Sequence, residues 1–137
     1  IVLNADSFLR APLALMMGFH KHHQMLATMS VFSDLDAVPV PANVKMQQVH
    51  VTDYKKGAGA NSGFTHVDSG IYVLNRQLIE SMNQKKFQLE DLWEPLISRR
   101  SLGGFRVNER FYDIGTPERL KLFEERLSDY FPNSIST

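Results

Sequence analysis

The chain has 137 residues, of which 43% are hydrophobic and 22% charged, a composition that suits one globular domain. Its 15 basic and 15 acidic side chains balance, which excludes the basic surface of a nucleic-acid-binding protein and an acidic, disordered tail. The absence of cysteine excludes disulfides and thiolate metal sites, and no apolar run approaches the roughly 18 residues that span a bilayer. We therefore expect a cytoplasmic protein with neither nucleic acid nor membrane as a partner.

The first segment is a short apolar run at residues 1–3, followed by polar residues at 4–7. This pattern is typical of a fully buried strand whose carboxyl end carries polar groups. Because chain termini are usually exposed and the chain does not begin with methionine, we expect further residues before Ile1 in the complete protein.

A helix is predicted from residue 13 to about residue 25, since Pro12 suits the first turn of a helix. After Pro12, Leu13, Met16, Met17 and His20 recur at helical spacing. We interpret its methionines, with Met25 and Met29, as core residues. The histidines at 20, 22 and 23 resemble a metal cluster, but no carboxylate accompanies them, so a helix covering a sheet is the preferred interpretation.

The central part of the chain alternates strands and connections. We predict strands at 27–32, at 49–54 (with one buried face) and at 66–74. Residues 33–44 contain aspartates and prolines and are predicted to connect two strands, and the small residues at 57–63 are predicted to form a loop.

The following segments are predicted to be a short helix at 75–82 and an amphipathic helix at 87–98, despite Pro95, with Trp93 in the core. Gly103–Gly104 is interpreted as a turn, and short strands are expected at 105–107 and 110–112.

A strand-to-helix junction is predicted at residues 113–118. Thr116 suits an N-cap, Pro117 the first helical position, and Glu118 complements the positive end of the helix. The buried side of this helix is expected at Leu120, Phe123 and Leu127, and the polar tail at 132–137 is expected to fray.

Strands and helices therefore mix along the chain, which predicts an α/β fold with a Rossmann-like mixed sheet flanked by helices. Ligands of such sheets gather at the carboxyl ends of strands. Asp6 and Asp113 both fall at predicted strand ends, which makes them the first candidates for a functional site.

Five segments, in order, are similar to motifs of one enzyme family. They are VLNADSF (2–8), the segment from Asn43–Val44 to Tyr54–Lys55–Lys56, VDSGIY (67–72), FQLEDL (87–92) and FYDIGTPE (111–118). The last of these is the most specific. Together they resemble the sugar-1-phosphate nucleotidyltransferases, most closely the bacterial enzymes that activate heptose, mannose or glucose 1-phosphate for cell-surface polysaccharide.

The resemblance implies transfer of a nucleotidyl group from a nucleoside triphosphate to a sugar 1-phosphate, assisted by Mg²⁺. It implies that Asp6 and Asp113 bind the metal and that Lys56 binds the sugar phosphate, with Lys55 as the alternative lysine. It also implies sugar contacts from Asp68 and Glu90. The same comparison adds Asn4 and Gly70 to the substrate-binding residues.

The chain also departs from the family pattern. Ala5 replaces a glycine, Lys55 replaces an acidic residue, and the glycine-rich GGxGTRL loop that cradles the triphosphate is not among these residues. Residues 1–137 are therefore interpreted as the sugar-phosphate and metal-binding part of a nucleotidyltransferase domain, incomplete at its N-terminus. The alternative is a non-catalytic fragment or binding module, and its exposed sheet edges would favour a homo-oligomer.

Individual residues keep simpler alternatives. Asp6 could be an ordinary polar strand end, and Asp113 could cap the last helix. Lys56 and Glu90 could be solvated surface charges. Asp68 lies in an apolar strand, where an unpaired carboxylate would be costly, so we expect it to have a partner.

Overall fold

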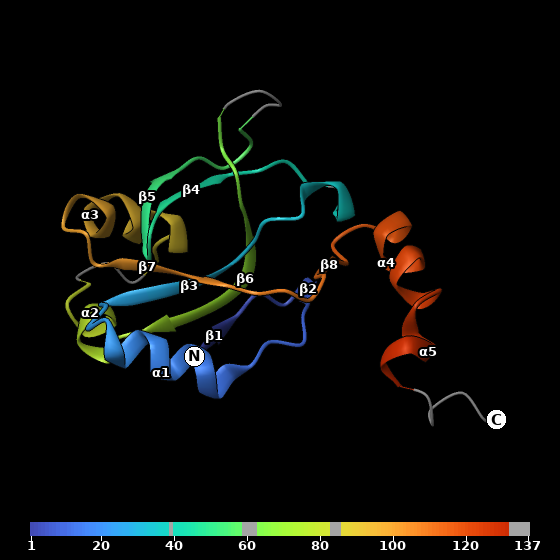
Figure 1. The fold of residues 1–137 in the computed structure, drawn as a ribbon, viewed down its shortest axis with the longest axis horizontal. Helices are drawn as coiled ribbons and strands as arrows, with labels where there is room; N and C mark the ends of the chain where they lie inside the picture. The colour runs from blue at the N-terminus through green and yellow to red at the C-terminus, as the bar shows by residue number, and fades with distance from the viewer. Residues whose placement is uncertain (39, 59–62, 83–85, 132–137) are drawn as a thin grey trace.

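The computed structural model describes residues 1–38, 40–58, 63–82 and 86–131, and a six-stranded mixed sheet forms its centre (Figure 1). Its strands are β1 (Val2–Leu3), β3 (Ala27–Phe32), β4 (Val44–Gln47), β5 (His50–Tyr54), β6 (Val67–Leu74) and β7 (Leu102–Arg106). They lie in the order β1-β6-β3-β7-β5-β4, with β3 and β7 parallel and the other neighbours antiparallel. The predicted mixed sheet is confirmed.

Helices cover both faces of this sheet. The α-helices are α1 (Leu13–His22), α2 (Arg76–Glu80), α3 (Trp93–Ser98), α4 (Pro117–Glu124) and α5 (Leu127–Tyr130), and short 3₁₀ turns are η1 (Leu35–Ala37) and η2 (Leu89–Leu92). Helix α1 packs on β3, β6 and β7, whereas α3 packs on β5 and β7 from the opposite face (Figure 1). None of the helices in the described ranges is long and apolar enough to cross a membrane.

A second, two-stranded sheet lies between the main sheet and the last helices. It pairs β2 (Ser7–Phe8) with β8 (Tyr112–Asp113), and α4 and α5 extend away from it on the side opposite α3 (Figure 1). Aromatic rings hold this part together, with Phe8 and Phe123 4.6 Å apart between centroids. The region is thus attached to the main sheet mainly by strand connections and a few side chains.

The core lies around β3, whose six residues are all buried. Both faces of this central strand are covered, which explains why its side chains are buried despite their alternating polarity. Met16 and Met29 are fully buried, so the interpretation of these methionines as core residues is confirmed. His20 is also buried, and its Nδ1 lies 2.9 Å from Thr28 Oγ1.

The interpretation of Gly103–Gly104 as a turn was wrong, because both glycines lie inside β7. Strand β7 runs between β3 and β5, where neighbouring side chains crowd the backbone. A Cβ on Gly103 would lie 3.0 Å from Phe19 Cε1, and one on Gly104 would overlap the end of Met46. Glycine is needed here for close packing, a role that the sequence pattern shares with a turn.

Two further segments differ from expectation. Of residues 1–3, only Val2 and Leu3 form a strand, and they are 40% and 60% exposed rather than buried, because β1 is an edge strand with β6 on one side only. The helix predicted at 87–98 divides into η2 and α3. Proline is tolerated only in the first turn of a helix, so Pro95 requires α3 to begin near Trp93.

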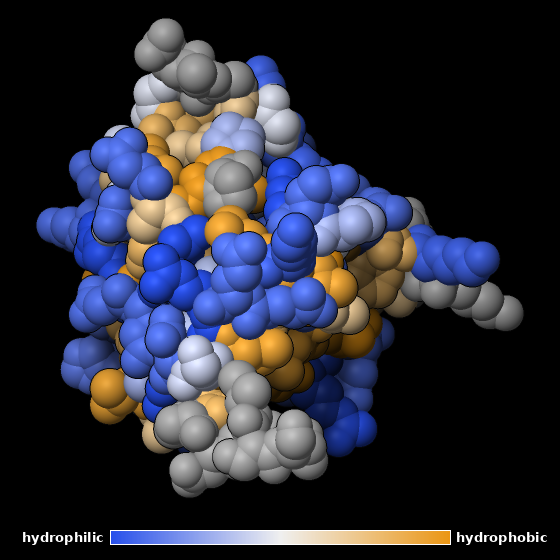
Figure 2. All heavy atoms as spheres, turned by 90° about the vertical axis from the view of Figure 1, so that its right-hand side faces the viewer, coloured by the Kyte–Doolittle hydropathy of each residue, from blue (hydrophilic) through white to orange (hydrophobic). Residues whose placement is uncertain are grey.

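Helix ends also differ. Helix α1 ends at His22 rather than near Met25, because Gln24 takes a positive φ of 51°. The predicted stripe on the last helix holds only for Phe123, which is buried, whereas Leu120 is 40% exposed. Figure 2 shows this side of the molecule, where apolar surface lies between hydrophilic side chains.

Strand β4 was not predicted, and the short strands expected at 105–107 and 110–112 correspond only to the end of β7 and the start of β8. Other predictions agree with the structure in their described parts. The strands at 49–54 and 66–74 correspond to β5 and β6, and Asn75 caps the short helix α2. Thr116 caps α4 with Pro117 at its start, as expected. Residue 39 of the 33–44 connection, residues 59–62 of the glycine-rich loop and the tail at 132–137 lie outside the described residues.

Candidate functional site

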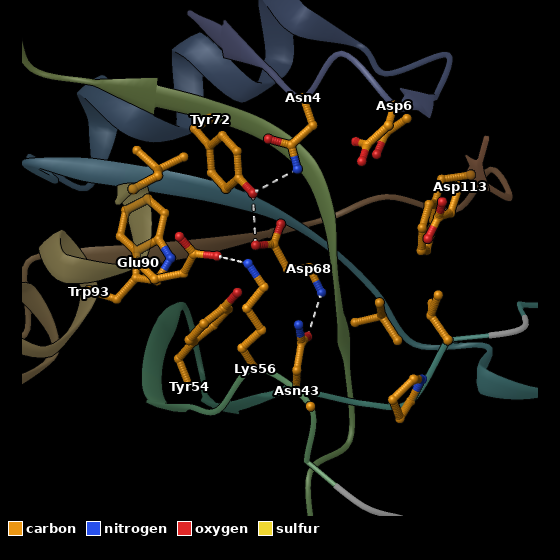
Figure 3. A pocket seen from close by; sticks show the side chains of 17 residues that line it. Asn4, Asp6, Asn43, Tyr54, Lys56, Asp68, Tyr72, Glu90, Trp93 and Asp113 are labelled. Atoms are coloured by element: carbon orange, nitrogen blue, oxygen red, sulfur yellow. Dashed lines mark hydrogen bonds and ion pairs between the residues drawn. The ribbon is translucent and has the colours of Figure 1, made fainter. Parts of the chain in front are cut away.

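A pocket of about 380 Å³ lies where the main sheet meets the two-stranded sheet (Figure 3). Six of the eight predicted site residues line it: Asn4, Asp6, Lys56, Asp68, Glu90 and Asp113. They come from the chain between β1 and β2, the end of β5, strand β6, turn η2 and strand β8. Residues distant in the sequence therefore meet in one cavity.

One wall of the pocket is aromatic. Tyr72 from β6 and Trp93 at the start of α3 lie 5.4 Å apart between ring centroids, and Tyr54 from β5 meets Trp93 edge to face at 6.4 Å. Trp93 is only 1% exposed, so the wall is part of the hydrophobic core and its position is fixed. A rigid aromatic surface of this kind suits the apolar faces of a sugar ring.

Asp68 sits beside this wall with its carboxylate satisfied by the protein. Oδ1 accepts the Gly70 N–H at 3.0 Å, and Oδ2 accepts the Tyr72 hydroxyl at 2.8 Å. The expected partner of this carboxylate is thus supplied by β6 itself. Burial raises the pKa of Asp68 to about 6, since it penalises the charged form more than the two donated hydrogen bonds favour it.

The hydrogen bonds continue from Asp68 into the pocket. Asn4 Nδ2 donates to the Tyr72 hydroxyl at 3.4 Å, and Asn43 Oδ1 accepts the Asp68 backbone N–H at 2.8 Å. The chain Asn4–Tyr72–Asp68 is visible in Figure 3. It orients an exposed amide group toward the cavity.

An ion pair lies at the mouth of the pocket. Lys56 Nζ donates to Glu90 Oε1 at 2.5 Å, with the two side chains 75% and 29% exposed. This hydrogen bond raises the pKa of Lys56 and lowers the pKa of Glu90, so both groups are charged at neutral pH. Lys55 does not line the pocket, which places the neighbouring lysine, Lys56, at the site.

The two candidate metal ligands lie side by side at the other end of the pocket (Figure 3). Ser7, the residue after Asp6, pairs with Asp113 across the β2–β8 sheet, and Ile114 N–H donates to the Asp6 carbonyl at 2.8 Å. Both carboxylates approach Gly115, where a Cβ would lie 3.2 Å from Asp113 Oδ1 and 3.4 Å from Asp6 Oδ2. Gly115 therefore leaves room for the pair.

Asp113 is already engaged by its own loop and helix. Its Oδ1 accepts the Gly115 N–H at 2.9 Å, and its Oδ2 accepts from Arg119 Nη1 at 2.5 Å. Sequence reasoning missed Arg119. The sequence feature that could have indicated it is its position in the first turn of α4. From there a long side chain can extend toward the residues before the helix, where Asp113 lies.

The two carboxylates offer the kind of oxygen donors that a magnesium ion prefers. Mg²⁺ is often held by one or two carboxylates and completes its shell with water and substrate phosphates. In the described residues, no group of three or more His, Asp or Glu side chains could hold a metal. An ion bound by the two carboxylates would therefore need water and phosphate oxygens as its other ligands. Four carboxylates and one lysine line the pocket, so an anionic ligand needs added positive charge.

Gly70 was also predicted to bind substrate, but it does not line the pocket. Its φ is +86°, and a Cβ there would lie 3.0 Å from Ser7 Oγ and 3.2 Å from Asn4 Cβ. Its carbonyl accepts the Asn4 N–H at 2.9 Å. Glycine at this position lets the chain between β1 and β2 approach β6, and so sets the position of Asn4.

Sequence reasoning did not assign site roles to Asn43, Tyr54, Tyr72 and Trp93, all of which line the pocket. Tyr72 lies four residues after Asp68 in the same strand, and residues an even number apart share one face. That spacing was the available signal for Tyr72. The sequence around Trp93 indicated only a core residue and gave no signal of a role in the site.

No protein-family model matches the chain, and no curated protein matches it by sequence. Its fold is similar to that of solved structures. Two are a UTP-bound UGPase (TM-score 0.71, 16% identity) and a UDP-glucose pyrophosphorylase (0.70, 17%), both from Acinetobacter baumannii. A third, from Bacillus anthracis in complex with a sucrose, is provisionally assigned as a glucose-1-phosphate thymidylyltransferase (0.69, 12%).

These structures cover 97%, 93% and 96% of the chain, whereas the chain spans only 51%, 50% and 53% of theirs. The predicted fold class is thereby confirmed: the chain has the fold of about half of a sugar-nucleotide pyrophosphorylase. At this level of identity the likeness concerns the fold alone.

Proposed function

We propose that the protein transfers a nucleotidyl group from a nucleoside triphosphate to a sugar 1-phosphate and releases pyrophosphate. The observation that carries this proposal is one pocket that combines a carboxylate pair, a lysine and an aromatic wall with hydrogen-bonding groups. The residues 1–137 would supply the sugar-phosphate and metal side of the reaction. A glycine-rich triphosphate loop would have to come from outside these residues.

The reaction joins two anions. A phosphate oxygen of the sugar 1-phosphate attacks the α-phosphorus of the triphosphate, a new P–O bond forms, and the bond to the β-phosphate breaks as pyrophosphate leaves. Mg²⁺, when bound, supplies positive charge between the phosphates. Asp6 and Asp113 would hold this ion at the end of the pocket where they lie side by side.

Lys56 would bind the phosphate of the sugar substrate. It is the basic residue among the lining side chains, and its charge is secured at neutral pH by the raised pKa. Its ammonium pairs with Glu90. A substrate phosphate would compete with Glu90 for this ammonium and would free the Glu90 carboxylate. The freed carboxylate of Glu90 would then accept a hydrogen bond from a sugar hydroxyl.

The sugar ring would lie against the aromatic wall. Tyr54, the half-buried ring of this wall, offers apolar surface backed by the buried Trp93, and Asn4 offers amide groups held by the hydrogen bond to Tyr72. Asp68 has both carboxylate oxygens occupied, so we assign it the role of positioning Tyr72 and Asn4, with any direct sugar contact as a third bond. Glucose 1-phosphate, with heptose and mannose 1-phosphates, is the substrate class that we propose.

Pyrophosphate release tests the proposal. The purified protein should release pyrophosphate from a panel of nucleoside triphosphates when a sugar 1-phosphate and Mg²⁺ are present. Asp113→Asn and Asp6→Asn should each reduce the rate by at least about 100-fold, as expected when one charge-stabilising group is lost. Asp129→Asn is the matched control, since Asp129 is an exposed aspartate on α5 away from the pocket, and it should retain the rate. Equal rates in all three variants would refute the metal assignment.

A second candidate function rests on the residues themselves, among which no glycine-rich triphosphate loop occurs and Ala5 stands where the family motif has glycine. A module with this half of the site could bind a sugar phosphate without turning it over. The same assay separates the two, because a binding module would bind glucose 1-phosphate but release no pyrophosphate with any triphosphate or metal.

A further inference from the structure

We propose that Arg119 is the resident counter-ion of Asp113, and that a divalent cation must displace it to bind. Arg119 would thus be a positioning residue that sets the affinity of the site for metal. This inference rests on the proposed role of Asp113 as a metal ligand. It adds a residue that the family-like motifs did not assign.

A cationic side chain already lies beside one carboxylate oxygen of Asp113. Arg119 Nη1 lies 2.5 Å from Asp113 Oδ2, and the Gly115 N–H takes Oδ1, so each carboxylate oxygen carries a donor. Asp6 differs, because none of the hydrogen bonds found among the described residues involves its carboxylate. The two neighbouring carboxylates therefore differ: the charge of Asp113 is balanced by Arg119, whereas the carboxylate of Asp6 is open to a ligand.

The arginine reaches Asp113 from the first turn of α4. Thr116 Oγ1 accepts the Arg119 backbone N–H at 3.3 Å, which anchors the turn, while the side chain folds back across it. The Arg119 side chain is 35% exposed, and α4 is attached through the buried Phe123 rather than through Arg119. The guanidinium can therefore turn into solvent without opening the core.

Electrostatics makes the two cations exclusive competitors. A carboxylate-bound Mg²⁺ lies about 2 Å from its ligand oxygen, so an undisturbed guanidinium would be within a few ångströms of a dication. Like charges at that distance repel strongly. A metal ion bound at Asp113 Oδ2 would therefore break the Arg119–Asp113 pair, and the cost of breaking the pair would weaken the apparent affinity.

Mn²⁺ binding tests this directly, with the free ion counted by electron paramagnetic resonance as a readout independent of turnover. Arg119→Met removes the donors but keeps a long, helix-compatible side chain. It should tighten Mn²⁺ binding by roughly twofold to fivefold, the range expected for loss of a partly exposed ion pair. Arg126→Met is the matched control, since Arg126 pairs with Asp129 on the surface of α5, and it should leave the affinity unchanged.

A double variant shows whether the effect passes through Asp113. In the Asp113→Asn background, Arg119→Met should bring no gain, because the pair is already broken. An equal gain in both backgrounds would show a general charge effect and overturn the inference, as would unchanged or weaker binding in Arg119→Met alone. If Asp113→Asn itself binds Mn²⁺ as tightly as the unaltered protein, the metal role of Asp113 in the proposed function fails, which is a separate result.

Discussion

The aromatic wall of the pocket is formed by the six-stranded sheet and by helix α3 packed on it, whereas the carboxylate pair lies at the small β2–β8 sheet. On the first side, Trp93 is buried in the main core and Tyr72 is hydrogen-bonded on a central strand. On the second side, each strand has two residues, and support comes from a few rings, such as Phe8 stacked near Phe123. The same cavity is thus built from a well-packed half and a lightly packed half.

The difference suggests a division of tasks. Side chains in a dense core hold one position, which suits recognition of a sugar of fixed shape. Regions with few buried contacts open and adjust at lower free-energy cost, which suits a cation site that must exchange Arg119 for a metal. Changes on the first side should therefore affect the whole fold, and changes on the second side should act locally.

The largest effect is expected at Trp93. Trp93→Ala should lower the free energy of unfolding by about 3–5 kcal/mol, because it empties a large buried volume beside Tyr72. Urea unfolding measures this loss. Leu122→Ala on α4 is the control, since Leu122 is 40% exposed and its loss should be far smaller. Similar losses in the two variants would contradict the division between the halves.

Strand β7 offers the next test. Gly103→Val should cost about 1–3 kcal/mol, because its side chain would press on Met25 and Phe19. Gly18→Ala in α1 is the matched glycine control. Nothing lies within 4 Å of its added Cβ, so thermal unfolding should be unchanged or occur at a higher temperature. A fully tolerated Gly103→Val would mean that β7 is not packed as described.

The pH dependence of stability tests the partly buried carboxylate of Asp68. The pKa of Asp68 is raised to about 6 from an ordinary value of 3.8. Between these two pH values, the Asp68 carboxyl stays protonated in the folded protein but is ionised in the unfolded chain. The stabilisation from this proton is present below about pH 4 and is lost as the pH rises through 6, in total about 1–3 kcal/mol. Unfolding of Asp68→Asn should lack this part of the pH dependence. An unchanged pH profile would refute the raised pKa.

The smallest effect is expected at the cap of α4. Thr116→Ala removes the side chain that accepts the Arg119 N–H and should cost about 1 kcal/mol. Hydrogen exchange should speed up in α4 and not in β3 or β6. Faster exchange throughout the main sheet would show that the two halves unfold together.

The sequence predicted those parts of the fold that depend on local patterns. Strand β6 contains β-branched and aromatic residues, and the junction at Thr116–Pro117 has the cap chemistry of a helix start. Prediction from the sequence failed where a residue is required by contacts with a neighbouring helix or strand. Gly103 and Gly104 resemble a turn until Phe19 and Met46 are seen to crowd them.

The candidate site shows the same limit. Motif resemblance found Asp6, Lys56 and Asp113 because their types carry the chemistry. It could not show that Arg119 reaches Asp113, since that depends on a side-chain conformation in α4. Nor could it show that Gly70 acts by close approach to Asn4 rather than by lining the pocket.

Calorimetric titration with glucose 1-phosphate tests the account of the pocket most directly, because two adjacent lysines differ in their placement. Lys56 lines the cavity and pairs with Glu90, whereas Lys55 lies outside the lining. Lys56→Met should weaken binding by about tenfold or more, the loss expected for a charge-assisted hydrogen bond to phosphate, and Lys55→Met should bind as the unaltered protein does. Weakened binding in Lys55→Met with unchanged binding in Lys56→Met would contradict the assignment of this pocket as the sugar-phosphate site.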